Sequence, residues 1–226
     1  MQEYDIFYRQ IMQRYGVDAV LKDMGPAFIA ALVKAFGEKI FCATDFEGFP
    51  IELVTEYIQR THIFYLQKKL PEIEQSIFHL SELYNAGHPV LAALNNFFHR
   101  YSTELDEHIR EEETRLLPYI RLLLRCLRDG SHTSLYVLSR QEYCVTLFLE
   151  GHHDTEDELA DIRRVIQLYN PPEVNASLYR ILLSQLQSFE RDLQIHAHIE
   201  NQVLLPRALQ MELILYRRIN HWGQLN

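Results

Sequence analysis

Apolar side chains recur at intervals of three or four residues along most of this chain, which is the period of a helix with one buried face. After Pro50 the pattern predicts four long helices, at about residues 50–85, 90–129, 133–169 and 173–217. Because the turns between them are short, neighbouring helices are expected to run antiparallel. The sequence therefore predicts an all-α fold, an antiparallel up-down four-helix bundle.

Glycine and proline mark the ends and irregularities of these predicted helices. Pro71 falls inside the first helix and predicts a kink there. Gly130 ends the second helix, and Asn170-Pro171-Pro172 ends the third. In the third helix we expect the inward stripe to include Tyr143, Leu147, Glu150 and His153.

The first part of the chain has a weaker pattern, with short helices predicted at about residues 3–15 and 26–37. The run from Gly37 to Pro50 contains glycine, proline and mixed charges without a clear period, which is typical of a linker. We therefore divide the chain into a small helical N-terminal extension, residues 1–48, and the bundle, residues 49–226.

Composition and charge narrow the class of protein. The 226 residues carry a formal net charge of −9, which disfavours nucleic acid as a partner. The three cysteines are scattered and form no disulfide framework or C-x-x-C motif. The sequence shows no signal peptide and no apolar run of membrane-spanning length. We expect a cytoplasmic protein without a membrane partner.

The motif His-x3-Glu-x5-Pro occurs twice in the predicted helices. Its copies are HIREEETRLLP, from His108 to Pro118, and HAHIENQVLLP, from His196 to Pro206. A helical residue and its fourth neighbour lie on one face, about one turn apart. The histidine and glutamate of each copy therefore point in the same direction.

Each predicted helix also places one of the chain's 11 histidines on its inward stripe. Imidazole suits first-row metals, and a carboxylate can bridge a pair of cations. Two cations would also offset the cost of burying two carboxylates. We predict a two-metal centre, most simply of iron with manganese or zinc left open, in which each metal takes the histidines of one helical hairpin and the glutamates are shared. Its six predicted ligands are His62, His108, Glu112, His153, His196 and Glu200.

Other residues of ligand type are set aside by their direction on the helix. His152 points about 100° away from His153, and His153 continues the predicted inward stripe. His198 lies two residues from His196 and faces elsewhere. We expect solvated charges or ordinary core packing for the remaining neighbours, Glu111, Glu113, Tyr65 and Tyr119.

Several stretches resemble hemerythrin-like (HHE cation-binding) domains, and most closely the repair-of-iron-centres proteins. They are Thr61-His62 with Leu70-Pro71-Glu72, the two motif copies, with the second extended to Ala208, and HDTEDEL from His153 to Leu159. The similarity covers about residues 50–210. It implies a four-helix bundle with a non-haem di-iron centre, an oxo or hydroxo bridge, and the six residues above as ligands. It also implies a role in recovering iron–sulfur clusters after nitrosative and oxidative stress.

The chain departs from this family in its first residues. Repair-of-iron-centres proteins usually carry a Cys-Cys pair in a small N-terminal domain, whereas Ala19 and Val20 stand where thiols are expected, and Cys42 is alone. Oxygen-carrying hemerythrins use a fifth histidine and an aspartate that are not clearly matched here, which argues against simple oxygen transport.

Three hypotheses follow. The leading one is a di-iron protein of iron-centre repair or of the response to nitric oxide (NO) and oxygen species, with NO, O2 or iron-acceptor proteins as partners. The second is a module that senses O2, NO or redox state without turnover, and the third is a metal-binding bundle with no repair role. Enzymatic reduction of NO or O2, a homodimer, and a docking role for residues 1–48 stay open.

Overall fold

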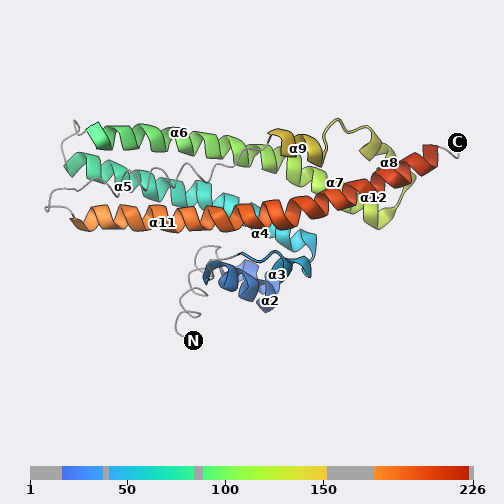
Figure 1. The fold of residues 1–226 in the computed structure, drawn as a ribbon, viewed down its shortest axis with the longest axis horizontal. Coiled ribbons are helices and arrows are strands. Elements are labelled where there is room, and N and C mark those ends of the chain that lie inside the picture. Colours follow the sequence, from blue (N-terminus) through green and yellow to red (C-terminus); the bar gives the residue numbers. More distant parts are fainter. Residues whose placement is uncertain (1–16, 38–40, 84–88, 152–175, 224–226) are drawn as a thin grey trace.

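Helices account for nearly all of the computed structural model, which describes residues 17–37, 41–83, 89–151 and 176–223. Long helices run side by side along its longest axis (Figure 1). No strand occurs among these residues, so the predicted all-α class is confirmed. In the same residues, no helix is both long and apolar enough to cross a bilayer.

Three of the predicted long helices form continuous rods, each containing one π-turn. In chain order these rods are α4 (Ile51–Phe64), η1 (Tyr65–Lys69) and α5 (Leu70–Leu83); α6 (Pro89–Glu111), η2 (Glu112–Leu116) and α7 (Leu117–Asp129); and α11 (Ala176–Ile199), η4 (Glu200–Leu204) and α12 (Leu205–Gly223). Helix α5 lies between α6 and α11 in Figure 1 and contacts both. The predictions for these helices are confirmed within the described residues, although the last rod continues beyond the expected end at Arg217 to Gly223.

Each of these three π-turns is followed directly by the dipeptide Leu-Pro. The N–H of each leucine donates to the carbonyl five residues earlier, from Leu70 to Tyr65, from Leu117 to Glu112 and from Leu205 to Glu200. A proline ring in a regular α-helix clashes with the carbonyl four residues before it, and the wider π-turn relieves that clash. At Pro71, where the sequence predicts a kink, the irregularity takes the form of η1.

The helix predicted at 133–169 is not continuous. Gly130 adopts φ 55 and ends α7, as predicted. Helix α8 (His132–Ser139) is followed by the non-helical residues 140–144 and then by α9 (Val145–Gly151). The prediction is therefore wrong at this break, which is held by contacts with α7 and α12, and the part after Gly151 lies outside the described residues.

The N-terminal helices pack on the rods. Helix α2 (Val17–Gly37) bends at Gly25, which has φ 76, so the helix predicted at 26–37 forms its second half. The short α3 (Thr44–Glu47) follows, and the helix predicted at 3–15 lies outside the described residues. Phe28 meets Tyr57 edge-on with ring centroids 5.9 Å apart, inside a core shared with α4, α7 and α12. The domain boundary after residue 48 stays a prediction.

Buried apolar side chains form two clusters along the rods. The first cluster contains side chains from α2, α3 and α7, from the first part of α4, from the last part of α11 and from α12. The second contains side chains from α5, α6 and most of α11. The clusters meet between Ile58 and Phe64, between Ile109 and Leu116, and between Leu193 and Ile195. Buried polar side chains occupy this level, and the candidate site lies among them.

Candidate metal centre

Five of the six predicted ligands converge at the level where the two apolar clusters meet. His62 is on the last turn of α4, His108 and Glu112 are at the junction of α6 and η2, and His196 and Glu200 are at the junction of α11 and η4. Four of these side chains are buried, whereas that of His108 is 21% exposed. Each glutamate is the first residue of a π-turn, an irregularity that is frequent at functional sites.

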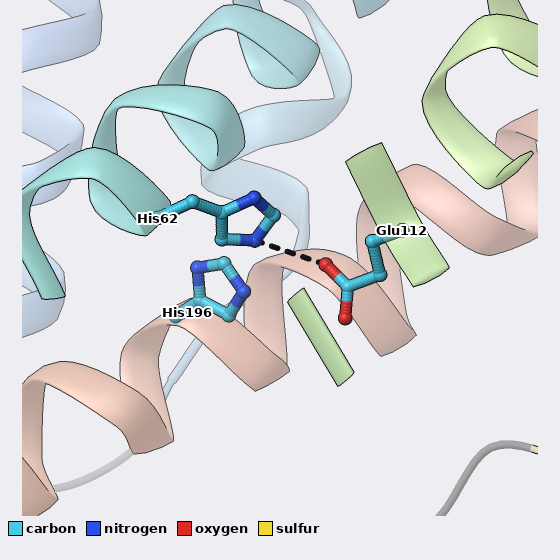
Figure 2. A group of neighbouring side chains, drawn as sticks. All are labelled: His62, Glu112 and His196. Carbon is cyan, nitrogen blue, oxygen red and sulfur yellow. Dashed lines mark ion pairs between the residues drawn. The ribbon is translucent and has the colours of Figure 1, made fainter. Parts of the chain in front are cut away.

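The carboxylate of Glu112 lies between two histidines. Its Oε2 is 2.9 Å from Nε2 of His62, as Figure 2 shows, and its Oε1 is 2.6 Å from Nε2 of His108. The two oxygens of one fully buried carboxylate therefore face imidazoles on two different rods.

The ligand atoms form two groups that share Glu112. His62 and His196 belong to one group, and His108 and Glu200 to the other, and the ligand atoms of each group lie within 4.8 Å of one another. The rings of His62 and His196 lie next to each other, tilted by 51° with centroids 5.0 Å apart (Figure 2). His62 and His108 of the same hairpin fall into different groups, because α4 packs on α11 and η4 at this level, and the expected sharing of ions by hairpin stays a prediction.

Several buried polar atoms lie in this cluster, and Nε2 of His62 and both carboxylate oxygens of Glu112 make no hydrogen bond among the described residues. Their contacts have ion-pair distances but lack hydrogen-bond geometry. Buried polar atoms in this condition raise the free energy of the fold, and a cation that accepts their lone pairs removes the cost. Imidazole nitrogen and carboxylate oxygen are suitable donors for a first-row divalent metal. The residues present therefore fit a metal ion.

Without a metal, His62 and Glu112 carry opposite charges. Burial opposes the charge on His62, but contacts with Glu112 and Glu113 outweigh burial and raise the pKa of His62 to about 9. Burial likewise opposes the charge on Glu112, but contacts with His108 and His62 hold the pKa of Glu112 far below its usual value. Metal binding at Nε2 of His62 must therefore release a proton near neutral pH.

Two residues outside the predicted ligand set contact the site histidines. Glu113 Oε1 lies 2.7 Å from Nδ1 of His62, and Gln59 donates to its other oxygen at 3.0 Å. Thr61 Oγ1 lies 2.7 Å from Nδ1 of His196. The expectation that Glu113 is a solvated charge is wrong, and no sequence pattern predicted a role for Thr61. The only feature of the sequence that could have predicted these contacts is that Thr61 and Glu113 each lie next to a predicted ligand.

The other excluded residues that the structure describes lie as expected, and His152 lies outside them. His198 is half-buried against the ring of Phe41, with centroids 5.2 Å apart, and does not belong to either ligand group. Glu111 pairs with Arg115 at the surface. Tyr65 and Tyr119 are core residues, and the Tyr65 ring meets His196 edge-on at 5.6 Å.

The sixth predicted ligand, His153, lies outside the described residues. The stripe that favoured it over His152 is wrong in α9, because Leu147 and Glu150 are exposed. The buried residues of α9 are Val145 and Phe148. His153 therefore stays a prediction that rests on the resemblance of HDTEDEL alone.

Comparison with known proteins relates the chain to iron–sulfur cluster repair proteins. It is 24% identical over 152 residues to the iron-sulfur cluster repair protein ScdA of Staphylococcus haemolyticus, covering 67% of this chain and 64% of the relative. It is 21% identical over 158 residues to ScdA of Staphylococcus epidermidis, covering 70% and 66%. It is 30% identical over 110 residues to the iron-sulfur cluster repair protein YtfE of Yersinia pestis, covering 48% and 43%.

The matched region spans less than two thirds of the length of these curated relatives. No family model matches the chain. Fold, site and comparisons together define an all-helical protein, similar to proteins named for iron–sulfur cluster repair, with clustered histidines and glutamates that could hold a metal.

Proposed function

We propose that this chain is a hemerythrin-like four-helix bundle with a non-haem di-iron centre, which acts in iron–sulfur cluster repair or in the response to nitric oxide and oxidative stress. The observation that carries the proposal is the position of Glu112, shared by two ligand groups with one oxygen toward each of two histidines. A carboxylate in this position can bridge two cations. The names of the relatives support a repair role.

The described residues would hold the two ions asymmetrically. His62 and His196 would bind one ion, His108 and Glu200 the other, and Glu112 both. His153 is the proposed further ligand. When bound, an iron pair supplies redox chemistry and coordination positions for NO or O2. The chain itself contributes buried, fixed donors, and the partly exposed His108 marks the side nearest to solvent. Iron-acceptor proteins are the proposed partners.

Metal analysis tests the proposal. Protein loaded anaerobically with ferrous iron and then desalted is expected to retain about two iron atoms per chain, as a carboxylate-bridged pair requires. Glu112→Ala removes the shared ligand and is expected to lose most of both ions. His196→Ala is expected to lower the iron content, whereas His198→Ala, two residues away on α11 and outside both ligand groups, retains it.

The same assay tests the sixth ligand with neighbouring histidines. His153→Ala is expected to lower the iron content, and His152→Ala is the matched control. The reverse order would move the assignment to His152. Folded wild-type protein that retains no iron, manganese or zinc would contradict the proposed function.

A further inference from the structure

Thr61 joins two helices through one hydroxyl group. Its Oγ1 donates to the carbonyl of Ile58 at 2.6 Å and lies 2.7 Å from Nδ1 of His196. A hydroxyl has one hydrogen, and here that hydrogen is directed to Ile58. Thr61 Oγ1 therefore accepts its second hydrogen bond, and the proton of that bond is carried by Nδ1 of His196.

Glu113 makes the equivalent contact with His62. An ionised carboxylate only accepts hydrogen bonds, so the 2.7 Å contact requires the proton on Nδ1 of His62. The hydrogen bond from Gln59 to the second oxygen at 3.0 Å fixes the direction of the carboxylate. The two buried histidines of one ligand group are thus both protonated on Nδ1.

A neutral imidazole carries one proton, so protonation on Nδ1 leaves the lone pair on Nε2. For His62, Nε2 is the atom that faces Glu112 at 2.9 Å. We infer that Glu113 and Thr61 are positioning residues that fix His62 and His196 with their Nε2 lone pairs directed to the metal centre. This inference rests on the proposed function only in taking a metal as the acceptor of those lone pairs.

Each of the two contacts joins neighbouring rods. Thr61 precedes the ligand His62 on α4 and holds the histidine of α11, whereas Glu113 follows the ligand Glu112 on η2 and holds the histidine of α4. Adjacent helical residues point about 100° apart, so one member of each pair faces the centre and the other faces a ligand on the neighbouring rod. Outer contacts of this kind typically change metal affinity by about 10–100-fold.

Substitution of Thr61 tests the contribution of its hydroxyl group to metal affinity. Thr61→Val keeps the shape but removes the acceptor, and is expected to weaken ferrous-iron binding by about 10–100-fold. Thr61→Ser is expected to restore the wild-type affinity. Thr55→Val is the matched control, because Thr55 is also buried on α4 and donates to a carbonyl of its own helix, that of Ile51, without touching a histidine.

Substitution of Glu113 tests the contribution of its carboxylate to metal affinity. Glu113→Ala is expected to weaken binding by about 10–100-fold, and Glu113→Gln to weaken it less, because the amide oxygen can still accept from Nδ1. Glu111→Gln removes the same charge two residues away, at the exposed pair with Arg115, and is expected to leave the affinity unchanged.

Two readouts test the inference. Dissociation constants are measured anaerobically by competition with a chromophoric ferrous chelator, and 15N chemical shifts in the zinc-loaded protein report which imidazole nitrogen carries the proton. Wild-type affinity in Thr61→Val and Glu113→Ala, or protonated Nε2 atoms in the zinc-loaded wild type, overturns the positioning roles while the di-iron proposal stands. A folded wild type without metal affinity overturns both.

Discussion

At the scale of single residues, the charge of His62 links the stability of the metal-free protein to pH. Its contacts with Glu112 and Glu113 outweigh burial and raise its pKa from 6.5 to about 9. A group whose pKa is higher in the folded state stabilises that state below its unfolded pKa, and the contribution is lost as pH rises through the folded pKa. The stabilisation from His62 is therefore complete below pH 6.5 and is lost by about pH 9.

We expect the free energy of unfolding of the metal-free protein to fall as the pH rises from about 6.5 to 9, and His62→Gln to remove much of that slope. Urea denaturation at a series of pH values measures both. His99→Gln, at an exposed position on α6, is the control and keeps the wild-type slope. An unchanged slope in His62→Gln would show that the contacts of His62 do not set the pH dependence.

The sequence predicted the clustering of the candidate ligands better than the residues that contact them. The spacing of four residues places His108 with Glu112, and His196 with Glu200, in any α-helix. The sequence also predicted correctly that the Glu113 side chain points away from the direction of Glu112. It did not predict which side chains Glu113 contacts there. A helical period gives the direction of a side chain, whereas the neighbour in that direction, here His62 on α4, depends on how the rods pack.

At the scale of elements, uninterrupted periodicity predicted the three rods, whereas the break between α8 and α9 has its cause elsewhere in the chain. The buried carboxylate of Glu212 on α12 accepts hydrogen bonds from the N–H of Val145, at 3.1 Å, and from the hydroxyl of Tyr119. Tyr143 meets Tyr119 edge-on, with ring centroids 5.4 Å apart. Tertiary contacts thus fix the start of α9, and no local sequence pattern predicts these contacts.

We expect Glu212→Ala to lower the free energy of unfolding by about 1–3 kcal/mol, because it leaves the Val145 N–H and the Tyr119 hydroxyl without their acceptor. Urea denaturation of the metal-free protein measures the change. Glu74→Ala, at an exposed position on α5, is the control and is expected to stay within about 0.5 kcal/mol of wild type. Equal stability of the two variants would contradict the anchoring role of Glu212.

At the scale of the whole molecule, a metal bound by the buried polar side chains between the two apolar clusters would add to the stability of the whole fold. Glu112 and Glu200 are buried where the rods meet, and in the metal-free fold Glu112 pairs with the buried His62. The ligands come from three rods and converge only in the folded chain. A metal that binds this arrangement and not the unfolded chain stabilises the fold by mass action.

We therefore expect ferrous iron at about 100 times its dissociation constant to stabilise the fold by about 2.7 kcal/mol, which raises the melting temperature by about 5–10 °C for a chain of this size. A chelator reverses the shift. The double variant Glu112→Leu/Glu200→Leu is expected to lose the shift and, without metal, to melt below the wild-type temperature, because loss of Glu112 leaves the buried, charged His62 without one of its partners. Glu74→Leu/Glu111→Leu, at exposed positions, keeps the full shift. A shift that survives in the first double variant would place the stabilising metal away from these buried polar side chains.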